Sequence, residues 1–372
     1  MKKNTLSLIL GSVLAAFAVS SFAADVQLYG KVDTQLHYAH TKTGKGVKTD
    51  KFEMTDGSSR FGINAREKLS DDVTVKVYLE NGFKADSGEF MVNNTLWNRR
   101  AILAVNSQKY GELAFGRMGG VDTIFGPYGQ GIGSLCTFLT GYGPDFSLDG
   151  MFASETTQMS NAVSYISPKI NGFKAAFTYS FAMDAQENEH TNRNNRDLSG
   201  YVSYDIGDLH LVLGGAEIFS AKSDTLDRKD QTQIFAGATY KILPNVQIHG
   251  AVQTMKDWRN LFYSGWMADV YGIEGGMDGQ AYMLGIRYNP TANQALIASA
   301  MLFDGDFDDR NGVKQDAQRQ RINLGYEYKF SKRTMAYAVA GYTKNKDALV
   351  DATGRTPYES EFTAYAGLQI WF

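Results

Sequence analysis

The sequence predicts an all-β fold, a barrel of sixteen antiparallel strands that crosses a membrane. Three features predict it: an N-terminal export signal, segments in which apolar and polar residues alternate, and connections that alternate between short turns and long loops. Beyond the export signal, the sequence has no run of about 18 apolar residues, the length that a membrane-spanning helix needs. Barrel strands have no such run, because lipid-facing and lumen-facing side chains alternate along them.

The first residues have the pattern of a cleaved signal peptide. A basic Met1-Lys2-Lys3 start precedes an apolar run over residues 6–19, and the small residues around Ala23 suit a signal peptidase. We expect cleavage after Ala23, which divides the chain into a signal peptide, 1–23, and one barrel domain, 24–372. The mature chain then has 349 residues (372 − 23) and a formal charge of −5 (−3 − 2), since two lysines leave with the signal.

The first strand is predicted over residues 26–38. One of its faces carries Val26, Leu28, Gly30, Val32, Thr34, Leu36 and Tyr38. The opposite face carries Gln27, Tyr29, Lys31, Asp33, Gln35 and His37. A period of two is the pattern of a half-buried strand, and the segment exceeds the roughly 9–11 residues that a tilted strand needs to cross a bilayer.

Fifteen further segments repeat this alternation. They lie near residues 60–66, 73–80, 100–105, 113–117, 161–167, 171–182, 198–206, 208–219, 231–242, 245–256, 279–289, 293–304, 319–330, 333–344 and 361–372. The last segment ends in Phe372, and the barrel must close on itself because an open sheet edge in hydrocarbon would leave amides without partners. Sixteen strands enclose an aqueous channel.

The connections alternate in length. Short turns rich in Gly, Pro, Asn, Asp and Ser lie at residues 69–72, 107–109, 167–169, 207–208, 243–245, 289–291 and 331–332. Long polar segments lie at residues 40–57, 84–96, 119–158, 183–197, 220–230, 257–278, 305–318 and 346–360. Short turns at one end and eight long loops at the other are typical of outer-membrane barrels.

Four motifs resemble those of the general trimeric porins of Gram-negative bacteria, nearest to the porin-4 type. They are Leu28-Tyr29-Gly30-Lys31, Ser58-Ser59-Arg60-Phe61-Gly62, Leu79-Glu80-Asn81-Gly82-Phe83 and Gly111-Glu112-Leu113-Ala114-Phe115-Gly116-Arg117. The resemblance implies a homotrimer in the outer membrane, in contact with lipid and lipopolysaccharide, that works without a cofactor. It implies a general diffusion channel for ions and small hydrophilic solutes; a substrate-specific channel is the alternative.

In that family the third loop folds into the barrel and narrows it, which here implicates residues 119–158. Gly143-Pro144-Asp145-Phe146 resembles the Pro-Glu-Phe-Gly element of the family's constriction, so Asp145 is the first candidate for the acidic side, with Asp149 and Asp122 after it. The expected basic wall is Lys31, Arg60, Arg100 and Arg117. By alternation Lys31, Arg60 and Arg100 face the lumen, whereas Arg99 should point the other way, near a rim. Gln158 stands where the family often has another Arg, which leaves the ion preference open.

Other functions find little support in the sequence. Its five histidines form no recognisable nucleophile motif, and no basic patch suggests nucleic-acid binding. A single cysteine, Cys136, excludes an internal disulfide. Residues 304–312 begin like a calcium loop but have Asp309 where the required Gly should be, so we expect a solvated acidic loop there and no metal site, with loose divalent-cation bridging to lipopolysaccharide as the alternative.

Overall fold

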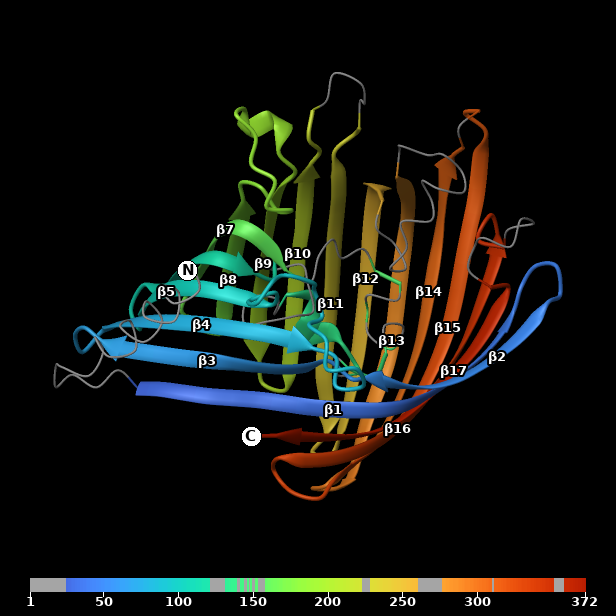
Figure 1. The fold of residues 1–372 in the computed structure, drawn as a ribbon, viewed down its shortest axis with the longest axis horizontal. Coiled ribbons are helices and arrows are strands. Elements are labelled where there is room, and N and C mark those ends of the chain that lie inside the picture. The colour runs from blue at the N-terminus through green and yellow to red at the C-terminus, as the bar shows by residue number, and fades with distance from the viewer. Residues whose placement is uncertain are drawn as a thin grey trace, which may run out of the picture.

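A computed structural model describes residues 25–120, 131–138, 141–143, 146, 148, 151–152, 158–222, 228–259, 276–309, 311–350 and 358–372. The strands form one continuous curved wall, in which the last strand lies beside the first (Figure 1). Their bounds are β1 Asp25–Lys42, β2 Lys48–Asp56, β3 Ser59–Lys68, β4 Val73–Phe83, β5 Arg100–Ser107, β6 Gly111–Met118, β7 Met159–Ile166, β8 Phe173–Ser180, β9 Arg196–Ile206, β10 Leu209–Phe219, β11 Gln231–Leu243, β12 Val246–Trp258, β13 Met277–Thr291, β14 Gln294–Asp308, β15 Lys314–Lys329, β16 Thr334–Asp347 and β17 Ser360–Trp371.

The barrel is closed and has sixteen strands, as the sequence predicted. The seventeen β segments reduce to sixteen because β2 and β3 are two parts of one strand, both paired with β1 and separated at residues 57–58. Ser58 adopts a left-handed backbone there, with φ of 73°. Closure comes from β1 and β17, which pair from Lys31↔Trp371 to Lys42↔Ser360.

Two of the predicted long loops are mostly strand. Segment 40–57 was expected to be a loop, but β1 and β2 stay paired out to Lys42↔Lys48. Segment 305–318 likewise continues the pairing of β14 and β15 out to Asp308↔Lys314. These hairpins are polar because they continue beyond the part of the barrel that lipid covers, so polarity alone did not distinguish them from loops.

The alternation separates two environments. Val26 and Leu28 on β1 are 62% and 66% exposed on the outer surface, whereas Lys31, Asp33 and Gln35 face inward and are buried. Among the described residues no helix has the length and hydrophobicity needed to span a membrane.

The described residues of the third loop pack inside the barrel and give the interior an apolar core. Its short 3-10 helix η2 (Ile132–Leu135) is buried against inward-facing side chains of the wall. Farther along, Phe138, Tyr142 and Phe146 form a second cluster on β14 and β16. This part of the loop therefore lines the inner wall of the barrel.

Candidate functional site

A group of three arginines surrounds one carboxylate on the inner wall. Glu80 on β4 is buried and pairs across the strands with Arg100 on β5. Its carboxylate oxygens lie 2.7 Å from Arg99 Nε, 3.7 Å from Arg100 Nε and 3.8 Å from Arg60 Nε. The Tyr29 hydroxyl donates a further hydrogen bond of 2.8 Å. Three positive charges share one negative charge, so these four ionic groups leave a net charge of +2 on the wall.

Arg99 is part of this group, which corrects the prediction that it points away toward a rim. It immediately precedes β5, where strand alternation does not yet apply, and its backbone N–H donates to the Glu80 carbonyl at 3.1 Å. The side chain of the preceding Asn98 takes the place of a backbone partner for Gly82. It accepts a hydrogen bond of 2.9 Å from the Gly82 N–H and donates one of 3.0 Å to the Gly82 carbonyl. Arg99 therefore turns inward and is only 5% exposed.

Arg60 and Arg100 are the members of this arginine group that solvent reaches. Their side chains are 15% and 20% exposed, while the carboxylate between them is almost fully covered. The Arg60 guanidinium also lies 4.9 Å from the centre of the Trp371 ring on β17, in cation–π geometry. Arg60 and Arg100 are thus held in fixed positions by their contacts, and their role in the wall of the channel stays a prediction.

Lys31 lies in a buried ion pair. Its ammonium donates 2.8 Å to Asp33 and 2.7 Å to the Gly57 carbonyl, and its side chain is 2% exposed. Asp33 accepts a further hydrogen bond of 2.7 Å from the Tyr337 hydroxyl. The charge of Lys31 is therefore compensated by its neighbour on the same strand and contributes little to the field in the channel.

Arg117 lies apart from the arginine group. Its side chain donates to the Asn98 carbonyl at 2.9 Å and to the Ser160 hydroxyl at 2.8 Å. By alternation it shares a face of β6 with Leu113 and Phe115, which are exposed on the outer surface. The described contacts make Arg117 a link between β6, β7 and the segment before β5.

The three acidic candidates, Asp122, Asp145 and Asp149, lie outside the described residues. The described residues nearest to Asp145 are Gly143 and Phe146, and Phe146 is buried on the inner wall. Whether these carboxylates line the constriction thus stays a prediction.

Two further inward-facing arginines were missed by the sequence reasoning. Arg321 on β15 is buried, donates to the Asn323 side chain at 2.7 Å and lies 4.8 Å from the Phe146 ring. Arg287 on β13 pairs with Glu327, which also accepts a 2.7 Å hydrogen bond from Tyr142 of the third loop. Burial of the Tyr142 hydroxyl, next to Glu327, raises its pKa well above the usual value. Alternation alone could have placed both arginines on the inner face.

Ser134, His210 and Asp205 come together although the sequence offered no sign of it. His210 Nε2 lies 3.1 Å from Ser134 Oγ, and His210 Nδ1 lies 2.6 Å from Asp205. These distances resemble those of a catalytic triad, but each end has another partner: Ser134 donates to the Gly131 carbonyl, and Lys169 holds Asp205 at 2.8 Å. The arrangement attaches η2 to β9 and β10.

The described residues of the acidic segment 304–312 belong to the end of the hairpin of β14 and β15. Asp309 accepts hydrogen bonds from the backbone N–H groups of Asn311 and Val313, and Lys314 pairs with Asp306 at 3.0 Å. Within the described part of the chain, no three His, Cys, Asp or Glu side chains are placed to hold a metal ion.

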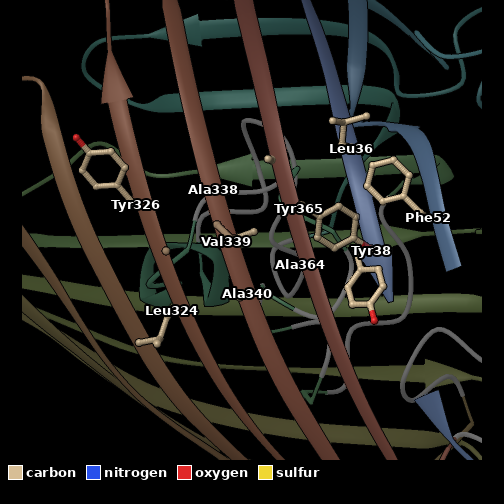
Figure 2. A pocket seen from close by; sticks show the side chains of 12 residues that line it. Leu36, Tyr38, Phe52, Leu324, Tyr326, Ala338, Val339, Ala340, Ala364 and Tyr365 are labelled. Carbon is tan, nitrogen blue, oxygen red and sulfur yellow. The ribbon is translucent and has the colours of Figure 1, made fainter. Parts of the chain in front are cut away.

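The outer surface carries an apolar groove over β16 and β17. Figure 2 shows Leu36, Tyr38 and Phe52 along one side and Leu324 and Tyr326 along the other. The floor between them consists of small side chains on alternating outward positions, Ala338, Ala340, Ala364 and Ala366. The groove is shallow and almost free of polar atoms.

Comparison with known proteins agrees with this architecture. Residues 11–348 match the family model of Gram-negative porins. The chain is 27% identical to an outer membrane porin protein of Bordetella pertussis over 95% of this chain and 97% of that protein. It is also 27% identical to outer membrane porin protein 32 of Delftia acidovorans, over 94% of this chain and 91% of that one.

Solved structures show the same fold. An anion-selective porin from Comamonas acidovorans superposes with a TM-score of 0.70 at 24% identity, covering 94% of this chain and all of that one. The trimer form of OmpT from Vibrio cholerae gives a TM-score of 0.63 at 19% identity, with coverage of 94% and 100%. With a family match over most of its length and a closed sixteen-stranded barrel, this chain belongs to the Gram-negative porins and forms a channel across the outer membrane.

Proposed function

We propose that this porin is a general diffusion channel for ions and small hydrophilic solutes, and that it prefers anions. The observation that carries the ion preference is the arginine group around Glu80, with its net charge of +2 on the inner wall. A basic wall raises the local concentration of anions and lowers that of cations, so selectivity follows from the local potential without tight binding. The name of the Comamonas acidovorans structure, an anion-selective porin, agrees with this proposal.

General diffusion is favoured over a specific channel by the positions of three inward-facing phenylalanine rings. A sugar-specific pore needs rings exposed to the passing solute. Phe235 on β11 and Phe303 and Phe307 on β14 are instead almost fully buried in the core that includes the third loop. These rings are part of that core and offer no surface on which a solute could stack.

The test is single-channel conductance of the purified protein in planar bilayers, under a salt gradient and with neutral sugars of graded size. Large ohmic steps that no particular sugar blocks, with a reversal potential on the anion side, are the expected result. Saturable block by one solute class would replace general diffusion with the specific channel. A reversal potential on the cation side would refute the proposed ion preference.

The proposal includes a homotrimer in contact with lipid and lipopolysaccharide. The alanine floor of the outer groove supports subunit contact, because small side chains let two surfaces approach closely. Cross-linking in mild detergent should give trimers, and Ala366→Lys should convert them to monomers. We further propose that residues 1–23 are removed on export, which N-terminal sequencing of the mature protein would check.

A further inference from the structure

The third loop lies against the inner wall at three glycines. Gly237 on β11, Gly285 on β13 and Gly325 on β15 face Leu135, Thr137 and Phe138 of the loop, respectively. We call these three the glycine track. Every second strand of this part of the wall contributes one glycine, and one loop residue covers each glycine.

The contacts leave no room for a side chain on the wall. A Cβ at Gly237 would lie 2.5 Å from Leu135 Cδ1, and one at Gly325 would lie 2.7 Å from Phe138 Cε1. At Gly285 it would lie 2.7 Å from both Cβ and Cγ2 of Thr137, and closer still to the hydroxyl. Thr137 is β-branched and stiff, so this contact is the hardest of the three to relieve by a side-chain rotation.

The track is a trough between larger side chains. The inward-facing neighbours two residues away include Phe235 beside Gly237, Met283 beside Gly285 and Glu327 beside Gly325. The three glycines also lie on one diagonal. On the intervening strand β12, Gly237 pairs with Ala251 and Gly285 pairs with His249, an offset of two residues (251 − 249). On β14, Gly285 pairs with Ser299 and Gly325 pairs with Ile297, which is again an offset of two residues (299 − 297).

Polar contacts hold the loop in this trough. The Thr137 hydroxyl donates to Met283 Sδ at 3.3 Å, next to Gly285 on the same strand. His249 Nδ1 lies 3.3 Å from the Leu135 carbonyl. These bonds and the close contacts fix both the position of the loop along the strands and its distance from the wall.

We propose that the glycine track determines the width of the channel, because it sets how far the third loop stands from the wall. Each missing side chain lets the loop lie closer to the strands and leaves more open space on its other side. A methyl group at Gly285 or Gly325 pushes the loop toward the channel, whereas one at Gly237 would also meet the Gly250 carbonyl oxygen of the wall at 2.5 Å. The inference rests on the channel function of the porin and not on its ion preference or its lack of solute specificity.

Gly285→Ala is the direct test, measured by single-channel conductance and by exclusion of neutral polymers of graded size. Because packed interiors have almost no spare volume, the loop must move by about 1 Å, which should lower conductance by roughly a fifth and reduce the largest polymer admitted. Gly250→Ala is the matched control. It lies at an outward-facing position on the neighbouring strand β12, and a Cβ there meets nothing within 4 Å, so conductance should stay at the wild-type value.

Rescue distinguishes loop position from general damage to the barrel. In the Gly285→Ala/Thr137→Gly double variant the new methyl group occupies the space that the threonine side chain leaves, so conductance should return toward wild type. Wild-type conductance of Gly285→Ala, or a double variant no better than the single one, would overturn the proposal. If Gly285→Ala does not fold, as judged by loss of heat-modifiable migration, Gly325→Ala against Phe138 takes its place under the same criteria.

Discussion

Replacing Glu80 by Gln changes the charge of the arginine group and keeps its shape. The carboxylate is the one negative charge among three guanidinium groups, so the net charge rises from +2 to +3. The glutamine carbonyl can still accept the hydrogen bond that Arg99 Nε donates at 2.7 Å. The substitution therefore tests the electrostatic role of Glu80 with little change in packing.

The size of the effect follows from Coulomb's law with screening. One added charge acts on an ion passing at about 6 Å in water with about 0.4 kcal/mol at 0.1 M salt. An anion gains this energy and a cation loses it, so the ratio of anion to cation permeability should rise about fourfold, since 1.4 kcal/mol corresponds to a factor of ten. The rise should shrink at 1 M salt, where the screening length is about 3 Å.

The assay is the reversal potential in a potassium chloride gradient across a planar bilayer. Asp304→Asn is the matched control, because it removes one negative charge from an exposed outward position on β14 and should leave selectivity unchanged. An unchanged reversal potential for Glu80→Gln, in protein that keeps its heat-modifiable migration, would show that the arginine group does not face the ion path.

Three further variants probe the channel. Replacing Arg60 and Arg100 together by Ser should enlarge conductance and favour cations, and unchanged currents would remove both residues from the channel wall. Asp145→Asn should move the reversal potential toward anions, because the constriction loses a negative charge; no movement would exclude Asp145 from the constriction. Tyr142→Phe removes the hydrogen bond to Glu327 and should cost about 1 kcal/mol, seen as a lower melting temperature in detergent, while an unchanged melting temperature would show that this bond does not stabilise the loop.

The strands were predictable because their signal is local. Alternation along residues 26–38 identified the lumen face of β1, and the ends of β10 and β17 lie within a residue or two of the predicted limits. Each of these strands has one face toward lipid, which makes a period of two visible in a single sequence.

The interior could be predicted only in part, because it depends on contacts between distant segments. Alternation placed Arg60 and Arg100 on the lumen face, but Arg99, which also binds Glu80, turns inward through the side chain of Asn98, outside any strand. Met283 faces inward although it is apolar, because Thr137 of the third loop packs against it. No rule of strand periodicity indicates which wall positions a loop will occupy.

The joining of the first strand to the last has a consequence for biogenesis. His37 on β1 and Thr363 on β17 are hydrogen-bonded across a separation of 326 residues. Contacts so far apart in sequence form late and slowly, because the ends of a long chain segment must meet before any pairing energy is gained. Until β17 is delivered, the unfinished sheet has two unpaired edges that could join those of another chain. The protein must therefore be kept from aggregating along its whole export route. Edge-to-edge association is prevented only when β17 pairs with β1, because the closed barrel then has no free edge.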